Sequence, residues 1–256
     1  MKRFLKYITI IGCILILVGI GVATAAFSLG ANPLRMFDDW EERFDGAPYE
    51  TFEMEFDEVN RLEINIKGGT VSMTADEEAE KLTVVTDNGK SEHITLHNLE
   101  RYKKLELLAK KDEEYLIQIP AEWRLSELDV DCAGGQFEGN EIRTDDAELS
   151  VSGGEIQIQQ VGGKETSMDC AGGDIEWTGT GELSREIDVD CAGGDITITL
   201  DEGVVPDRVG YEFDYAGGTI EFFGVDYDGM GAQKRRTPEG MPQLDLDVAG
   251  GTIRIQ

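Results

Sequence analysis

One unit recurs seven times in this chain: a run of alternating apolar and polar residues, a pair of glycines, and a second alternating run. Residues 188–198 (DVDCAGGDITI) show it most clearly. Alternation with a period of two is typical of half-buried β-strands. Glycine reaches positive φ angles without steric cost, so the chain can turn sharply between two strands. Each unit is therefore predicted to be strand, glycine corner, strand. The first glycines of the pairs are Gly68, Gly134, Gly153, Gly172, Gly193, Gly217 and Gly250.

The apolar positions of the units align in columns on either side of the glycine pair, so the units are expected to share one core. Five residues after the first glycine, every unit is apolar except one, which has Gly139. Two positions before the pair, the column consists of Ile66, Cys132, Val151, Cys170, Cys191, Tyr215 and Val248. Cysteine behaves as a small apolar residue in cores, so the three cysteines are expected to be buried, reduced thiols. A disulfide between Cys170 and Cys191, in consecutive units, is the alternative.

Two all-β architectures satisfy this pattern. A glycine pair between alternating runs is a hairpin signal, which would give a meander sandwich. From Gly134 to Gly193, however, the units follow one another at 19 to 21 residues. Such a regular period favours a β-solenoid, a β-helix-like stack in which each unit buries its apolar face against the next. The predicted fold is therefore an all-β solenoid, preceded by one transmembrane helix.

Two stretches depart from the repeat. Between the first and second glycine pairs, strand-like runs occur at residues 81–86, 104–109 and 115–119. They are expected to form degenerate coils or a small antiparallel cap over the open end of the stack. Near the C-terminus, residues 226–242 (DYDGMGAQKRRTPEGMP) are rich in glycine and proline and are expected to form a loop.

An uncharged stretch of 23 residues, 7–29, follows Lys2, Arg3 and Lys6. About 20 apolar residues in a helix suffice to span a bilayer, and positive charge in front of the span holds the short head in the cytoplasm. We expect an uncleaved anchor. Signal-peptide cleavage near residues 23–25 (ATA) and lipid modification of Cys13 are the alternatives; all three would export the remainder.

The expected organisation thus has four parts. Residues 1–6 form a cytoplasmic head, 7–29 a transmembrane signal anchor, and 30–51 a juxtamembrane linker with a short helix. Residues 52–256 form the extracytoplasmic β-strand-repeat domain. The protein is accordingly expected in the cell membrane as a single-pass protein with its C-terminal domain outside.

Three copies of the unit resemble a known family: residues 168–177 (MDCAGGDIEW), 188–198 (DVDCAGGDITI) and 244–255 (LDLDVAGGTIRI). They look like the bacterial "putative adhesin" domain of unknown function, a family of membrane-anchored β-strand-repeat proteins. The similarity covers about residues 52–256. It implies the repeat architecture and one N-terminal membrane helix, and some relatives lie beside envelope-stress regulators. It assigns no role to the cysteines.

The charge of the chain is strongly acidic, with 52 Asp and Glu against 23 Lys and Arg and a net charge of −29. Such a surface repels nucleic acid and anionic lipid headgroups, so basic partners or cations are expected. In a solenoid, outward acids would form ladders of like charge about 4.8 Å apart. These are expected to be a solvated face, with weak Ca²⁺ binding as the alternative. The ladders contain Asp131, Asp169, Asp190, Asp214 and Asp247 in one column and Asp129, Glu148, Asp188, Glu212 and Asp245 in another.

The sequence contains no recognisable catalytic or cofactor motif. GxSxG, HExxH, P-loop and CxxC patterns are absent. His93 and His97 are the only histidines, and on a strand they would share an exposed face. Residues 234–236 (KRR), the basic cluster outside the N-terminus, are expected in a solvated loop, with docking of an acidic partner as the alternative. No catalytic residue, cofactor or metal site is predicted, and the protein is not expected to be an enzyme.

Three functions remain. The favoured one is a binding or scaffolding module at the cell envelope, in adhesion or envelope-stress sensing, with an envelope protein or wall polymer as its partner and no nucleic acid. The second is a structural protein that self-associates by stacking end to end through an uncapped last coil at residues 253–256. The third and weakest is a β-helix carbohydrate-active enzyme. A glycosidase needs two carboxylates in a groove, but in a chain with 52 acidic residues the presence of such a pair is no evidence for one.

Overall fold

The computed structural model describes residues 50–181, 186–201, 204, 209–235 and 242–256. The expected cytoplasmic head and membrane anchor lie outside these residues, as does nearly all of the juxtamembrane segment. Within the described ranges, no helix has the length and apolar character needed to cross a membrane.

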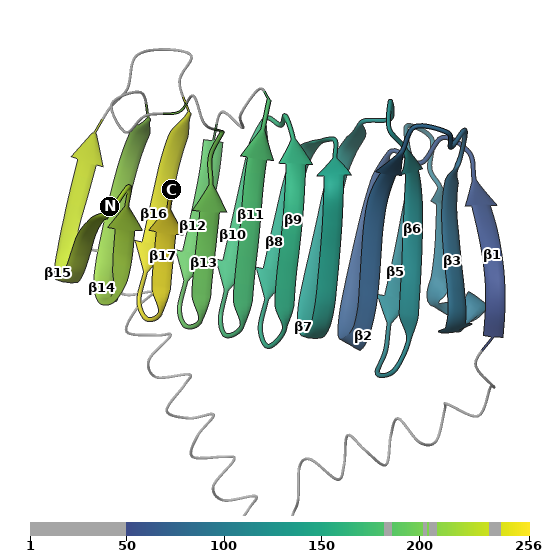
Figure 1. The fold of residues 1–256 in the computed structure, drawn as a ribbon, viewed down its shortest axis with the longest axis horizontal. Helices are drawn as coiled ribbons and strands as arrows, with labels where there is room; N and C mark the ends of the chain where they lie inside the picture. The colour runs from purple at the N-terminus through teal and green to yellow at the C-terminus, as the bar shows by residue number, and fades with distance from the viewer. Residues whose placement is uncertain (1–49, 182–185, 202–203, 205–208, 236–241) are drawn as a thin grey trace, which may run out of the picture. The chain divides into compact units, whose positions relative to one another are not determined.

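The described chain is a stack of parallel rungs, each with one strand on either side of a shared core (Figure 1). In one rung, β10 (Glu165–Cys170) leads through a glycine corner into β11 (Asp174–Thr180). Between neighbouring rungs the pairing is parallel and in register, so that Cys170 lies opposite Cys191 on one side and Val151 on the other. This pairing confirms the all-β solenoid-like architecture. In a meander sandwich, the glycine pairs would join antiparallel neighbours instead.

Every rung has a first strand before its corner and a second strand after it. In spatial order, the first strands are β5 (Lys103–Ala109), the first half of β2 (Arg61–Asp76), the first half of β7 (Leu125–Ile142), β8 (Thr144–Val151), β10, β12 (Glu186–Cys191), β16 (Gln243–Val248) and the first half of β14 (Gly210–Phe222). The second strands are β6 (Glu114–Pro120), the second halves of β2 and β7, β9 (Glu155–Val161), β11, β13 (Asp195–Thr199), β17 (Thr252–Ile255) and the second half of β14.

The order of the rungs in space differs from their order in the sequence. The last rung of the chain, β16 and β17, lies between the β12–β13 rung and β14. β17 is therefore paired on both sides, and the expectation that residues 253–256 form an uncapped end is wrong. The end of the stack is β15 (Val225–Arg235), which pairs antiparallel with β14. Residues 226–242 were expected to form a loop; of these, residues 226–235 belong to this edge strand.

The other end of the stack combines both structures expected for the irregular region. β5 and β6 form a true parallel rung beside β2. β1 (Glu50–Phe56), β3 (Leu82–Gly89) and β4 (Ile94–Asn98) add antiparallel strands around it, with a 3-10 turn at Ser91–His93 before β4.

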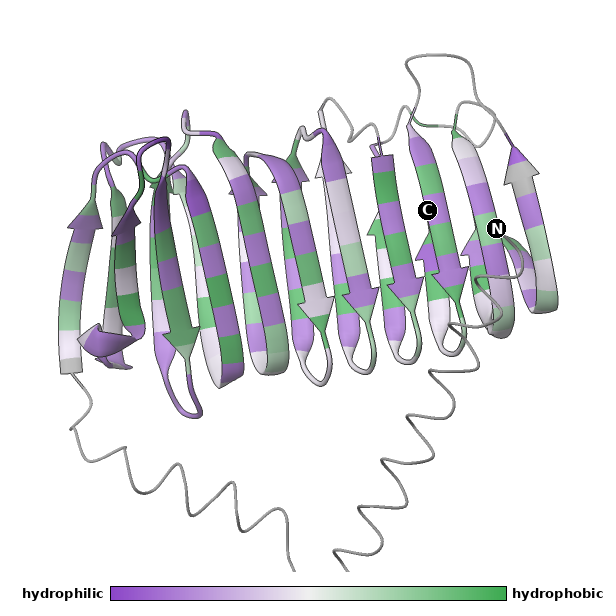
Figure 2. Ribbon diagram, turned by 180° about the vertical axis from the view of Figure 1, so that it is seen from behind, coloured by the Kyte–Doolittle hydropathy of each residue, from purple (hydrophilic) through white to green (hydrophobic). Residues whose placement is uncertain are grey.

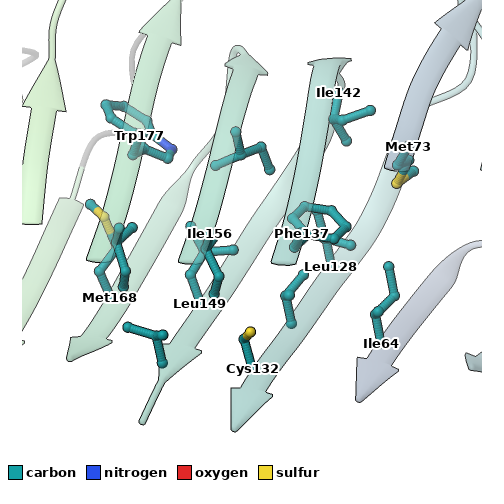
Figure 3. Close-up of a cluster of buried hydrophobic side chains, with 14 of the residues drawn as sticks. Ile64, Met73, Leu128, Cys132, Phe137, Ile142, Leu149, Ile156, Met168 and Trp177 are labelled. Carbon is teal, nitrogen blue, oxygen red and sulfur yellow. The ribbon is translucent and has the colours of Figure 1, made fainter. Parts of the chain in front are cut away.

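The core lies between the two layers of strands and consists of the predicted columns. Figure 2 shows the resulting alternation of apolar and polar residues along the strands, and Figure 3 shows buried side chains stacked from rung to rung. Cys132 is fully buried, and Cys170 and Cys191 are each 2% exposed. The one exception in the columns, Gly139, lies where a Cβ would approach Ile158 to 2.9 Å, so neighbouring side chains already fill that space.

The second glycine of each corner lies directly over the corner of the rung below. A Cβ on Gly194 would lie 2.1 Å from the carbonyl oxygen of Gly173, which accepts a hydrogen bond from the Asp195 N–H at 3.1 Å. Gly194 also has a φ of +86°. A side chain would therefore both strain the backbone and break a bond between rungs, which is why this position of the unit is glycine.

Candidate functional site

The first strands from β7 to β14 present a continuous anionic surface, which we call the acidic face. Residues alternate between the core and solvent, and nearly every outward position is a carboxylate. No Lys or Arg occurs in these strand segments. The acidic face consists of Glu127, Asp129, Asp131, Asp146, Glu148, Glu165, Asp169, Glu186, Asp188, Asp190, Asp245, Asp247, Glu212 and Asp214.

The strand register brings the predicted carboxylate columns together but reorders them. Asp247 lies between Asp190 and Asp214, because its rung is inserted there. With Asp169, these residues form an unbroken ladder over four rungs. Ser150 interrupts the same column between Asp131 and Asp169. A parallel ladder of Asp188, Asp245 and Glu212 runs beside it.

Burial, and then the crowding of like charge, changes the acidity of these groups. The pKa of Asp247 is raised from 3.8 to about 6, first because burial disfavours its charged form and then because Asp190 and Asp214 flank it. Burial and neighbouring acids also raise the pKa of Asp169 and of Asp190. At the other side of the face, the pKa of Asp129 is raised to about 6 by burial and by its acidic neighbours. The ladder therefore stores electrostatic repulsion at neutral pH.

This repulsion predicts an unusual dependence of stability on pH. Between pH 4 and 6 the folded protein retains a proton on Asp247 that the unfolded chain has released. The contribution of this residue to the free energy of unfolding therefore falls as pH rises through that window. Asp247→Asn is expected to raise Tm by about 2 °C at pH 7.5, an effect kept small because water screens exposed charges. The gain should vanish below pH 4.

Thermal unfolding of the full chain followed by circular dichroism at pH 3.5 to 8 measures this. Ser150→Asp provides the reciprocal variant, because it joins Asp131 to the ladder. It should lower Tm at neutral pH and recover with added salt. A Tm for Asp247→Asn equal to the parent's at pH 7.5 would show that the ladder is not under electrostatic strain.

A groove of about 240 Å³ runs along the glycine corners at the border of the acidic face. Its lining includes Asp131, Asp169 and Asp190 together with small residues such as Ala171 and Ala192. Two basic residues flank the opposite end of the first strands. There Arg124 and Lys164 pair with Asp145 at 3.4 and 2.7 Å, so they do not neutralise the ladder.

The second strands present a different outer surface, in which acids are matched by amides and a base. Gln157 donates to Glu176 at 2.9 Å, and Gln136 donates to Glu155 at 3.1 Å. Arg254 pairs with Glu221 at 2.8 Å. The acidic face also has basic neighbours at its two ends: Glu127 pairs with Arg61 at 2.8 Å, and Lys234 of β15 lies opposite Glu212 in the strand register. Negative charge is therefore densest along the ladder from Asp169 to Asp214.

The cysteines below the groove are free thiols, as expected from their inward column. Burial, and then the neighbouring Cys191, raise the pKa of Cys170 to about 12. Burial likewise raises the pKa of Cys132 and Cys191. The Cys170 thiol donates to the carbonyl of Gly193 at 3.0 Å. A thiol held protonated in this way is a poor nucleophile and a poor metal ligand.

The two histidines do not share a face, and the expectation that both are exposed strand residues is wrong for His93. Its ring is 7% exposed, and its Nδ1 lies 3.0 Å from an oxygen of the buried Glu113. Tyr115 donates its hydroxyl to the same carboxylate oxygen at 3.2 Å. His97 lies on β4 beside Glu106, at 3.0 Å. No sequence signal pointed to Glu113, because His93 lies twenty residues earlier, in the 3-10 turn before β4.

Among the residues that the structure describes, no three metal-ligating side chains form a group that could hold an ion. Calcium bridging between carboxylates of neighbouring rungs stays a prediction. Of the basic residues 234–236, the first two are the last residues of β15, and the third lies outside the described residues.

Comparison with known proteins gives one family and several similar structures. The family model described as Toastrack DUF4097 matches residues 53–237, from β1 to the end of β15. The match ends before β16 and β17, the rung that is inserted beside β14. No curated protein matches this chain.

Three solved structures illustrate the similarity. A "putative cell adhesion protein" from Clostridium sporogenes is 15% identical, with a TM-score of 0.47, over 80% of this chain and 99% of that one. A "putative lipid binding protein" from Parabacteroides distasonis is 13% identical, with a TM-score of 0.36, over 83% and 98%. A "putative adhesin" from Bacteroides fragilis is 12% identical, with a TM-score of 0.32, over 80% and 96%.

Proposed function

This chain belongs to the Toastrack DUF4097 family, and from that premise we propose that it is a non-catalytic binding module at the cell envelope. Residues 7–29 anchor it in the membrane, and the repeat domain lies outside the cell. Its contact surface is the acidic face, and its partner is cationic: a basic segment of an envelope protein, or a wall polymer that carries amines. Adhesion and envelope-stress sensing are the two roles that such a contact serves.

The observation that carries this proposal is the unbroken ladder of Asp169, Asp190, Asp247 and Asp214. The strands that carry the ladder contain no Lys or Arg. The pKa of Asp247 is raised first by burial and then by the flanking carboxylates of Asp190 and Asp214. A cationic partner would relieve the repulsion between these carboxylates on binding. Complementary charge also speeds encounter and selects partners, more than it adds affinity. A flat sheet of regularly spaced carboxylates suits an extended partner better than a small molecule, which needs a concave pocket.

The experiment is capture of the partner by the intact protein in its native membrane. The cross-linker reacts with amines, so that the Asp→Asn and Glu→Gln changes leave its lysine targets intact. It does not cross membranes, so that in intact cells it reaches only the outside of the cell. The ladder variant carries Asp→Asn at 169, 190, 214 and 247. The matched control neutralises four acids of the second strands, with Glu155→Gln, Asp174→Asn, Glu176→Gln and Asp195→Asn.

We expect capture to fall at least tenfold in the ladder variant and to remain in the control, and to weaken as salt is raised. Equal capture by both variants would refute the acidic face as the contact surface. Absence of any cross-link in intact cells, with cross-links appearing once the cells are opened, would refute the extracytoplasmic placement.

A further inference from the structure

We propose that two copies of this protein pair edge to edge through β15, antiparallel and about a twofold axis. The pairing joins two solenoids into one continuous sheet. It goes beyond the function proposed above, and it touches the acidic face only where Lys234 lies opposite Glu212 of β14.

β15 is an open edge of the sheet. Among the described strands it pairs with β14 alone, and Figure 1 shows it at the end of the row. The outer edge of such a strand carries backbone N–H and C=O groups ready to pair with another strand. Of the large apolar side chains in the described ranges, the two most exposed lie here: Met230, at 87%, and Val225, at 54%.

The order of charges along β15 favours a second, antiparallel copy of itself. Asp226 and Asp228 lie in its first half, and Lys234 and Arg235 end it. When two such strands pair antiparallel with Met230 opposite itself, the backbone register puts position 226 of each copy opposite position 234 of the other. With Gly231 opposite itself, position 228 lies opposite position 234 instead. Acidic positions thus lie opposite basic positions in both halves, as an isologous twofold contact requires.

The opposite end of the stack lacks this complementarity. β1 carries Glu50, Glu53 and Glu55 and no base. An antiparallel pair of β1 strands would bring no base of β1 opposite an acid, and Glu55 already pairs with Lys81 of its own chain at 2.9 Å. The arrangement therefore favours closed dimers through β15 over open-ended fibres.

β15 is also held in a fixed shape by the aromatic residues behind it. The ring of Tyr227 lies 5.6 Å from that of Phe213 and 6.3 Å from that of Tyr215. Gly231 lies against Tyr215, whose hydroxyl would be 2.4 Å from a Cβ at that position. A preorganised strand loses little conformational entropy on pairing.

A charge-swap experiment tests the proposal with the full chain in detergent micelles. The basic variant carries Asp226→Lys and Asp228→Lys, and the acidic variant carries Lys234→Asp and Arg235→Asp. Alone, each variant has charges of one sign throughout β15. Its dimer dissociation constant, measured by sedimentation velocity, is expected to be at least tenfold higher than that of the parent. Mixed, the two variants are again complementary and should form heterodimers, which separate tags reveal. Asp174→Lys with Glu176→Lys makes an equal charge change on β11 and should leave the parent dimer intact.

Cross-linking locates the contact. Met230→Cys lies next to the proposed twofold axis and should give disulfide-linked dimers under mild oxidation. Glu176→Cys on β11 should not, and the unaltered chain measures any background from Cys13. A parent protein that stays monomeric, dimers that persist in both charge variants, or a mixture that fails to restore dimers would overturn the proposal. Failure of Met230→Cys to form disulfide-linked dimers would also overturn it.

Discussion

Gly194→Ala is expected to lower the free energy of unfolding by about 3–5 kcal/mol. The positive φ of +86° accounts for about 1–2 kcal/mol of this with a non-glycine residue. The remainder comes from the Cβ, which would lie 2.1 Å from the carbonyl oxygen of Gly173. Neither corner can move away without loss of the hydrogen bond between Asp195 and Gly173, so overpacking of about 1–3 kcal/mol is added.

Gly224→Ala is the matched control. Gly224 has a φ of +79°, close to that of Gly194, but no atom lies within 4 Å of a Cβ there. Its substitution should cost only the backbone strain, about 1–2 kcal/mol. Urea unfolding of the full chain followed by circular dichroism measures both. Equal losses in the two variants would mean that backbone strain alone, and not the contact between rungs, explains the glycine corner.

Trp177→Ala is expected to cost about 3–5 kcal/mol, the usual range for removal of a buried aromatic side chain. Trp177 is 1% exposed in the middle of the stack, where Figure 3 shows it among the other core side chains. Its Nε1 donates to the side-chain oxygen of Gln160 at 2.8 Å. Gln160 is fully buried, so the substitution also removes one of the donors to that oxygen, the other being Thr166 at 3.2 Å.

A double-mutant cycle separates this packing from a general loss of stability. A Cβ on Gly179 would lie 2.1 Å from the ring of Trp177, so Gly179→Ala should be strongly destabilising in the parent. In the Trp177→Ala background the ring is absent, and Gly179→Ala should cost at least about 1 kcal/mol less. Additive losses would show that the two positions do not share the space that the structure gives them.

The repeat columns could be predicted because they express a local property of the chain. Inward positions such as Cys132 and Ile156 alternate with polar ones along a strand, and the glycine pair marks where the strand turns. The same reasoning predicted the acidic columns, including Asp190 and Asp247. Gly139 is the one position of the column without an apolar side chain, but a Cβ there would lie 2.9 Å from Ile158, which already fills that part of the core.

The order of the rungs could not be predicted in the same way. All units share one pattern, so the columns fit equally well whether β14 or β16 follows β12. One signal was present, in the bulky inward residues of β14. Tyr211 and Phe213 stack at 4.4 Å, and both lie near Phe222. Such rings suit the end of a stack, where no further rung of small side chains must fit over them and only β15 covers them.

The pairing of His93 with Glu113 was hidden for a similar reason. Twenty residues and two strands separate the two side chains in the sequence, and the contact exists only because β4, β5 and β6 fold around the same end.

By itself, then, the sequence determined the rung: which residues face inward, where the chain turns, and how negative the outer surface is. These follow from alternation and from glycine geometry, which act within a few residues. Only the tertiary structure decided which rung lies against which, and therefore that the aspartate ladder is continuous and that β15 is the open edge. Backbone pairing between parallel strands is nearly the same for every rung, so neighbours are chosen by the packing of whole side-chain layers, a property that no single segment contains.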